Sequence, residues 1–283
     1  SILSRLDDPT LLPNIASCSH LVQALSNHAF VMKYAKKTFE TQMDSEIAAI
    51  RAYFIWKSMV DMINEKKEIT NDELELAWRA HVNMLTMSSD AMLRRDDGRH
   101  TDDHLGLNVG RDTEELFVRL FQMHSDDMKL YGVSTYLSKA FGSVMKSWTK
   151  EQDARINQFK NTRKFEQVEN QLESMMYAAR SVTALLEFMK GHGVTPTPEH
   201  YASTIQAYAK CLNGNICSDN DNITKDILPQ VRKLLSEMEI DHLDRLVNKQ
   251  WDGYSVEAHE KIPASTFRTV IECFYHHSSR GFG

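Results

Sequence analysis

Residues 184–205, ALLEFMKGHGVTPTPEHYASTI, contain both a stop signal and a start signal for an α-helix. Glycine is enriched just after helix ends, so Gly191 and Gly193 predict that a helix terminates here. Thr197 and Pro198 follow. Threonine is a favoured N-cap residue, and proline is well tolerated at the first helical position. The stretch therefore predicts two helices joined by a short turn.

Apolar residues recur at three- and four-residue spacing on both sides of this turn, which is the period of an α-helix. A second start signal is the capping box formed by Thr70 and Glu73. Together these patterns predict helices near 20–38, 44–65, 70–85, 113–123, 135–148, 163–191, 198–212, 224–249 and from 262 onward. We find no alternating run long enough for a sheet, and we predict an all-α fold.

Apolar residues follow the helical period in the first two helices, at Leu21, Leu25, Phe30 and Met32 in the first and at Ile47, Ile50, Tyr53, Phe54, Trp56, Val60 and Met62 in the second. The methionines and the aromatic stripes are interpreted as core residues. The alternative is that methionine-rich and aromatic faces form an adaptable protein interface.

Two parts of the chain break the helical period. Residues 1–17 contain two prolines and predict an extended arm. Residues 94–112 contain three glycines and little periodicity, which predicts a loop or linker. The predicted organisation is an N-terminal helical region over 1–93, this linker, and a helical-repeat region over 113–283.

The composition favours helices and disfavours some classes of function. The chain has 11 glycines and 6 prolines in 283 residues, few for a protein that makes many turns. Its formal net charge is −6, so it lacks the overall basic excess typical of dedicated nucleic-acid binders. No window reaches the roughly 18 apolar residues of a transmembrane helix, and we expect no membrane span.

No catalytic motif is present in the sequence. We find no glycine-rich phosphate loop, no G-x-S-x-G and no pair of E-x-x-H motifs of the kind that di-iron helix bundles use, so we expect no enzymatic activity, cofactor or small-molecule substrate. His100 and His104 have metal-ligand spacing, but they lie in the predicted loop and Thr101 occupies the place of a catalytic glutamate. A solvated loop is favoured there over a metal site.

The four cysteines form no C-x-x-C pair, and we expect reduced, mostly buried thiols. A disulfide between Cys211 and Cys217 is the alternative.

The turn carries a longer pattern that resembles the pentatricopeptide repeat family. A second helix ends in Met189 and Lys190, Gly193 follows, and Pro196 leads to Tyr201 in the next helix. The match is specific only within 184–212. Weaker matches lie at 128–141 and 262–274.

The resemblance implies a fold, a location and a mode of action. It implies helix–turn–helix hairpins stacked as an α-solenoid with a concave binding surface. It implies a mitochondrial location, with a targeting segment removed before Ser1, or another organelle as the alternative. Members of the family bind single-stranded RNA or act as subunits of ribosomes and other organellar assemblies.

Some of the positions where the family reads RNA bases are occupied by residues that cannot hydrogen-bond to a base edge. The residue after Tyr201 is Ala202, which cannot hydrogen-bond to a base edge, and Thr197 and Arg268 occupy other such positions. We therefore expect a non-enzymatic subunit of a mitochondrial assembly, such as a ribosome, an ATP synthase or a respiratory complex. The alternative function is single-stranded RNA binding in organellar RNA processing or translation.

The candidate residues for binding a protein partner or RNA come from this comparison and from a small basic cluster. They are Lys160, Arg163, Lys164, Thr197, Tyr201, Ala202 and Arg268. Glutamates follow the basic cluster within two turns, so intrahelical ion pairs are the other interpretation of it.

Overall fold

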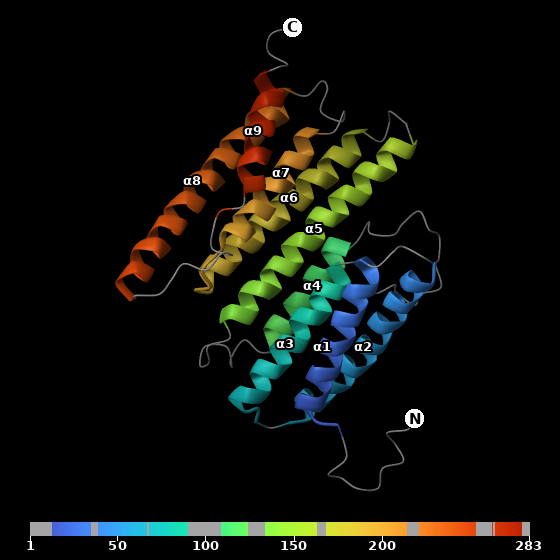
Figure 1. Ribbon diagram of the computed structural model, residues 1–283. Coiled ribbons are helices and arrows are strands. Elements are labelled where there is room, and N and C mark those ends of the chain that lie inside the picture. The colour runs from blue at the N-terminus through green and yellow to red at the C-terminus, as the bar shows by residue number, and fades with distance from the viewer. Residues whose placement is uncertain are drawn as a thin grey trace. The chain divides into compact units, whose positions relative to one another are not determined.

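The computed structural model describes residues 13–34, 39–66, 68–89, 109–123, 134–162, 168–213, 221–252, 262 and 264–278. Within these ranges it contains nine α-helices and no strand (Figure 1). The helices are α1 (Ile15–Tyr34), α2 (Phe39–Glu65), α3 (Asn71–Ser89), α4 (Val109–Met123), α5 (Ser134–Thr162), α6 (Val168–Gly191), α7 (Pro198–Asn213), α8 (Asp221–Asp252) and α9 (Ala264–Ser278). More than two-thirds of the chain is helical, and the prediction of an all-α fold is confirmed.

The chain divides into two compact units. One comprises Ser1–Arg99 with Glu115–Ala140, and the other comprises His100–Glu114 with Phe141–Gly283. In the first unit α1, α2 and α3 pack on one another. In the second, α7 packs on α6, α8 and α9.

The turn between α6 and α7 matches its prediction in detail. Gly193 adopts a left-handed conformation with φ of 71°. The Val194 amide donates to the Met189 carbonyl at 3.1 Å, and the Gly193 amide donates to the Lys190 carbonyl at 3.0 Å. This is the Schellman pattern, in which the last carbonyls of a helix are satisfied by the residues after it. The predicted helix–turn–helix is confirmed.

Replacing Gly193 by alanine should destabilise the protein by about 1–2 kcal/mol, the cost of a side chain in the left-handed region. Gly191 is the matched control, because neither glycine has a neighbour within 4 Å of an added Cβ and only Gly193 has positive φ. Gly191→Ala should be neutral or stabilise by up to about 1 kcal/mol through helix propensity. Denaturant unfolding of both variants measures the difference. Equal effects would contradict this account of the turn.

Two helices start earlier than the sequence patterns predict. Asn14 caps α1, because its Oδ1 accepts from the Ser17 amide at 2.8 Å while its own amide donates to Ser17 Oγ at 2.9 Å. Helix α1 therefore begins at Ile15, inside the extended arm predicted for 1–17, and residues 1–12 lie outside the described residues. Helix α4 begins at Val109, inside the linker predicted for 94–112. Residues 90–108 lie outside the described ranges.

The capping box predicted for α3 is present. The Thr70 amide donates to Glu73 Oε2 at 3.2 Å, and the Glu73 amide donates to Thr70 Oγ1 at 3.3 Å. Lys66 also reaches Glu73, with Nζ 2.5 Å from Oε1. The hydrogen bond from Lys66 is the main reason why the pKa of Glu73 is lowered.

The core of the first unit has a seam of small residues. Ala48, Ala49 and Ala52 of α2 are almost fully buried, as are Ala77 and Ala80 of α3. Larger side chains fill the same core at three- and four-residue spacing: Ile15, Cys18 and Val22 from α1, Trp56, Met59 and Ile63 from α2, and Met84 and Met87 from α3. Small residues at such a seam let the helices approach closely. The buried residues of α2 lie on one face of the helix, and the residues of another face, such as Ile50 and Phe54, are exposed.

The second unit holds a buried polar contact at the centre of three helices. Gln152 of α5 is fully buried, and its Nε2 donates to the carbonyl oxygens of Met175 in α6 at 2.9 Å and Ala207 in α7 at 3.0 Å. Its Oε1 has no hydrogen-bond partner among the described residues. Gln152 therefore fixes α5 against the α6–α7 hairpin through two directed hydrogen bonds.

Candidate functional site

An apolar groove runs between α1 and α2 in the first unit. Its lining comprises Leu21, Ala24 and Leu25 from α1 and Arg51, Phe54 and Ile55 from α2, around a volume of about 530 Å³. The lining residues recur at three- and four-residue spacing on each helix, so they lie on one face of each. The groove is therefore a property of the helix pair and requires no loop.

Large apolar side chains are exposed along this groove. Leu21 is 50% exposed and Phe54 is 61% exposed. Ile47 and Ile50 are also exposed on α2, and they lie one turn from Arg51 and Phe54. A single exposed apolar residue is ordinary on a protein surface, but a contiguous apolar patch marks an interaction site.

The prediction that the aromatic residues of α1 and α2 form the core is wrong for Phe30, Tyr53 and Phe54 and is confirmed for Trp56. Leu21, Phe30, Ile47, Ile50, Tyr53 and Phe54 are exposed, whereas Trp56 is buried and Leu25, Val60 and Met62 are partly buried against the core. The physical reason is that α2 turns its alanine-containing face to the core. The apolar residues on its outer side, Ile47, Ile50, Tyr53 and Phe54, remain exposed.

One positive charge lies in the apolar groove. Arg51 is the only charged residue of the lining, and it is exposed. It forms no hydrogen bond or ion pair with any residue that the structure describes. Its helical neighbours one turn away, Ile47, Ala48, Phe54 and Ile55, carry no acid that could pair with it. The groove therefore offers a guanidinium group to an outside carboxylate.

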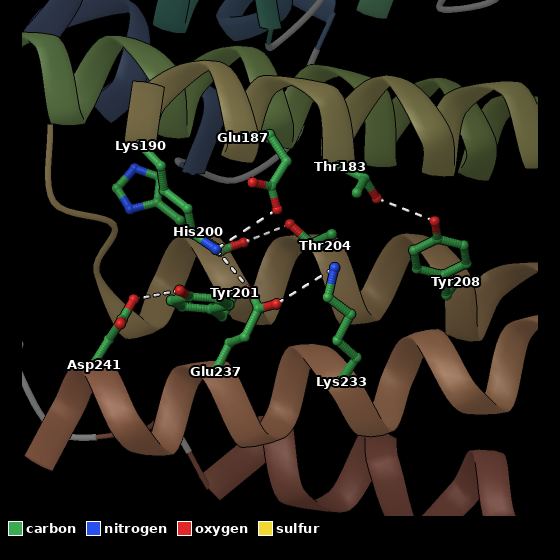
Figure 2. A network of polar contacts seen from close by, with 10 residues as sticks. All are labelled: Thr183, Glu187, Lys190, His200, Tyr201, Thr204, Tyr208, Lys233, Glu237 and Asp241. Carbon is green, nitrogen blue, oxygen red and sulfur yellow. Dashed lines mark hydrogen bonds and ion pairs between the residues drawn. The ribbon is translucent and has the colours of Figure 1, made fainter. Parts of the chain in front are cut away.

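A second cluster of polar residues joins α6, α7 and α8 in the other unit (Figure 2). Lys190 at the end of α6 lies between two acids, 2.7 Å from Glu237 Oε2 and 3.6 Å from Glu187 Oε1. Burial alone would lower the pKa of Lys190, but the hydrogen bond to Glu237 and the neighbouring carboxylates outweigh it and raise the pKa. The cation is thus held charged between helices.

Tyr201 lies at the centre of this cluster. Its ring is buried, and the Lys190 ammonium lies 5.2 Å from the ring centroid, in the range of a cation–π contact. Its hydroxyl donates a hydrogen bond to the Asp241 carboxylate of α8. Burial and then this bond raise the pKa of Tyr201 well above its ordinary value, so the hydroxyl keeps its proton and serves as a donor.

Replacing Tyr201 by phenylalanine should destabilise the protein by about 2 kcal/mol, because the lost hydrogen bond has a charged acceptor that stays half-buried. The matched control is Tyr208→Phe on the same helix, whose hydroxyl accepts from Thr183 Oγ1 at 3.1 Å, a neutral partner. The control should lose about 1 kcal/mol. Thermal or denaturant unfolding distinguishes the two, and equal losses would contradict the role given to Asp241.

Three candidate residues from the sequence lie at or near this cluster. Thr197 is the N-cap of α7, since its carbonyl accepts from the His200 amide at 2.9 Å and its own amide donates to His200 Nδ1 at 2.9 Å. Tyr201 is buried, and Ala202 is half-buried beside it. Thr197 and Tyr201 hold α7 in place, and the Tyr201 ring is not available to stack on a base.

The basic candidates are not brought together. Arg268 of α9 is 81% exposed and forms an ion pair with Glu272 one turn away, at 2.8 Å. Lys160 lies in α5, with its side chain outside the described residues. Arg163 and Lys164 also fall outside them.

The cysteine prediction is tested at two positions. Cys18 and Cys211 are buried thiols that form no disulfide. Burial raises the pKa of the Cys18 thiol, which keeps it protonated. Cys211 therefore forms no disulfide with Cys217, whose own placement is outside the described residues.

Comparison of the chain with protein-family models, with curated proteins and with solved structures finds no match. None of the helices in the described ranges combines the length and the apolar character needed to cross a bilayer. Among the same residues, no group of three or more histidine, cysteine, aspartate or glutamate side chains is placed to hold a metal ion. His100 and His104 lie outside the residues searched.

Sequence patterns did not reveal the groove as a site. The helical spacing indicates that α1 and α2 carry apolar residues. Both helices have apolar residues on two sides, so the spacing does not show which side faces the core. The signal that could have found the site is the set of three alanines in the first half of α2, Ala48, Ala49 and Ala52, which lie on the other side of the helix from Ile47, Ile50 and Phe54. Small residues favour close helix packing, which would have assigned the bulky side to the surface.

Proposed function

We propose that this chain is a non-enzymatic subunit of a multiprotein assembly and that it joins the assembly through the outer face of α1 and α2. The observation that supports this is the exposure of Leu21, Ile47, Ile50 and Phe54 around an apolar groove, while alanines fill the core behind them. Full burial of a large apolar side chain contributes roughly 1.5–3 kcal/mol. A partner that covers this face would gain several such contributions.

The location and the repeat architecture are part of the same proposal. The α6–α7 hairpin has the helix–turn–helix form on which the resemblance to pentatricopeptide repeats rests. We propose that the hairpins stack as a solenoid and that the assembly is mitochondrial. A ribosome, an ATP synthase and a respiratory complex are the candidate assemblies.

The proposal is tested by native purification. The tagged full-length chain, purified from mitochondrial extract and weighed by native mass spectrometry, should appear in a large particle with partners at fixed stoichiometry. Migration of the chain only as a free monomer would overturn the proposal.

RNA binding remains the alternative, and no observation in the described residues favours it. Arg268 is already paired with Glu272, and the chain is acidic overall. We expect weak, sequence-indifferent binding of labelled RNA at physiological salt, and no effect of Arg268→Ala. A true single-strand binder would lose affinity with salt at a slope of roughly −0.7 per phosphate contact. Tight, sequence-selective binding would reverse the choice between the two functions.

A further inference from the structure

The groove between α1 and α2 has the form of a helix receptor. Ile47 and Phe54 lie seven residues apart on α2, so this apolar stripe runs for about 10 Å, or two helical turns. The adjacent side of α1 carries Leu21 and Leu25. An amphipathic helix with apolar residues at positions i, i+3, i+4 and i+7 fits a surface of this length and spacing.

An extended peptide fits this surface poorly. The backbone amides and carbonyls of α1 and α2 are used within their own helices, so the groove offers no free backbone edge to pair with. An extended segment would place its unpaired backbone groups against Leu21, Leu25 and Phe54. A helix satisfies its own backbone hydrogen bonds and presents only side chains.

Arg51 adds a requirement for charge. It is exposed within the apolar lining and has no ion-pair partner in the described part of the chain. A partner that covers the groove must either leave this guanidinium facing apolar atoms or supply an acceptor for it. A carboxylate is the acceptor that matches a guanidinium best. A second copy of this chain on the same face would instead bring two Arg51 cations into one interface.

A membrane surface matches less well. Helices that lie on anionic lipid carry many lysine and arginine residues beside their apolar face. The groove has one cation, the exposed part of α2 also carries Asp44 and Asp61, and the chain has a net charge of −6.

We infer that the groove formed by Leu21, Ala24, Leu25, Arg51, Phe54 and Ile55 binds an amphipathic α-helix of a partner protein, and that this helix places an aspartate or glutamate against Arg51. The inference rests on the proposed function, because it names the kind of partner segment that the assembly supplies. It adds a contact between two side chains that can be tested separately from assembly itself.

The first step of the test is photo-crosslinking in the full-length chain. A benzophenone amino acid replaces Phe54 in one sample and Ile271 of α9, which is 66% exposed, in the control sample. After irradiation of native extract, the peptide linked to position 54 is sequenced. We expect one segment with helical apolar spacing and at least one acidic residue, and we expect it to be absent from the Ile271 control.

The second step is a charge exchange with that segment as a synthetic peptide. Arg51→Glu should weaken binding at least about tenfold, the scale of a lost charge-assisted hydrogen bond. Replacing the acid of the peptide by lysine should restore binding to Arg51→Glu and weaken binding to the wild type. Lys57→Glu makes the same charge change on α2 outside the groove lining and should alter affinity less than about threefold, as exposed pairs contribute little. Circular dichroism and unfolding should match the wild type for both variants, since both side chains are exposed.

Several results would overturn the inference. In the crosslinking step, these are the absence of a specific crosslink at position 54, a crosslink to RNA, lipid or a second copy of this chain, and a crosslinked segment that contains no acidic residue. In the binding step, the contradicting result is an equal loss of affinity for Arg51→Glu and Lys57→Glu. Co-sedimentation with vesicles of phosphatidylcholine and phosphatidylserine that is lost in Phe54→Asp would assign the groove to membranes instead. If Phe54→Asp still co-purifies with stoichiometric partners, the groove inference fails together with the binding face named under the proposed function, whereas membership of an assembly stands. A monomeric wild type in native extract removes the proposed function itself.

Discussion

Gly110→Ala should destabilise the protein by about 3 kcal/mol, although alanine is the better helix former by up to about 1 kcal/mol. A Cβ at this position would lie 2.4 Å from Cε3 of Trp148 and 2.9 Å from Glu151 Oε2. The Trp148 ring is buried and its Nε1 donates to Glu114 at 2.6 Å, so it cannot move without losing this bond. The Glu151 oxygen is held by the Gly110 amide at 2.9 Å. Steric overlap therefore outweighs helix propensity here.

The control for this variant is Gly142→Ala in α5. Its added Cβ would meet only His200 Nε2, at 3.4 Å, and His200 Cδ2, at 3.9 Å. We expect a change within about 1 kcal/mol, in either direction. Denaturant unfolding with circular dichroism measures both variants. A loss for Gly110→Ala no larger than that of the control would show that the helices separate easily at this position.

Gln152→Glu should destabilise the protein by about 4 kcal/mol at pH 7, the scale of an unpaired buried charge. A carboxylate only accepts hydrogen bonds, and it would face the Met175 and Ala207 carbonyl oxygens, to which the Gln152 amide now donates. Burial and these oxygens would raise the pKa of the new carboxyl in the folded state. The folded protein then binds a proton more tightly than the unfolded chain, so the loss of stability should shrink as pH falls toward about 4.3.

The control for this position is Gln152→Met, which keeps the shape of the side chain. It loses two hydrogen bonds of about 1 kcal/mol each, but it also removes the buried Oε1 that has no partner among the described residues. We expect a loss of no more than about 2 kcal/mol, independent of pH. Unfolding curves at pH 7 and pH 5 for both variants provide the measurement. A loss for Gln152→Glu that does not change with pH would contradict the proposed geometry.

Local signals in the sequence predicted the parts of the fold that depend on nearby residues. The α6–α7 turn needs only Gly193, Thr197 and Pro198, and its geometry follows from their backbone preferences. The capping box of α3 is equally local, because Thr70 and Glu73 satisfy each other.

The parts that the sequence did not predict depend on distant residues or on a choice between two helix faces. An amide in the first turn of α4, that of Gly110, is satisfied by Glu151, 41 residues away, and no local pattern in the sequence predicts this contact. The contact between Lys190 and Glu237 spans 47 residues. The period of α2 shows two apolar sides, and the period alone does not indicate which of them faces the core.

The location of the candidate site depends on which apolar side of α2 faces the core. The residues carried over from the family resemblance, Thr197 and Tyr201, cap or pack α7. The exposed groove lies instead in the first unit, where the sequence resembles no family known to us. A single arginine on a helix forms no motif, so the sequence alone does not single out Arg51.

The most direct measurement of the central claim is oxidative footprinting of Phe54 in two samples, the isolated chain and the native assembly. Phe54 is 61% exposed in the chain alone, and Phe267 of α9, 41% exposed, is the internal reference. We expect rapid labelling of Phe54 in the isolated chain and strong protection in the assembly, measured against Phe267. Equal labelling of Phe54 in both samples would contradict the claim that the outer face of α1 and α2 is where this protein binds its partner.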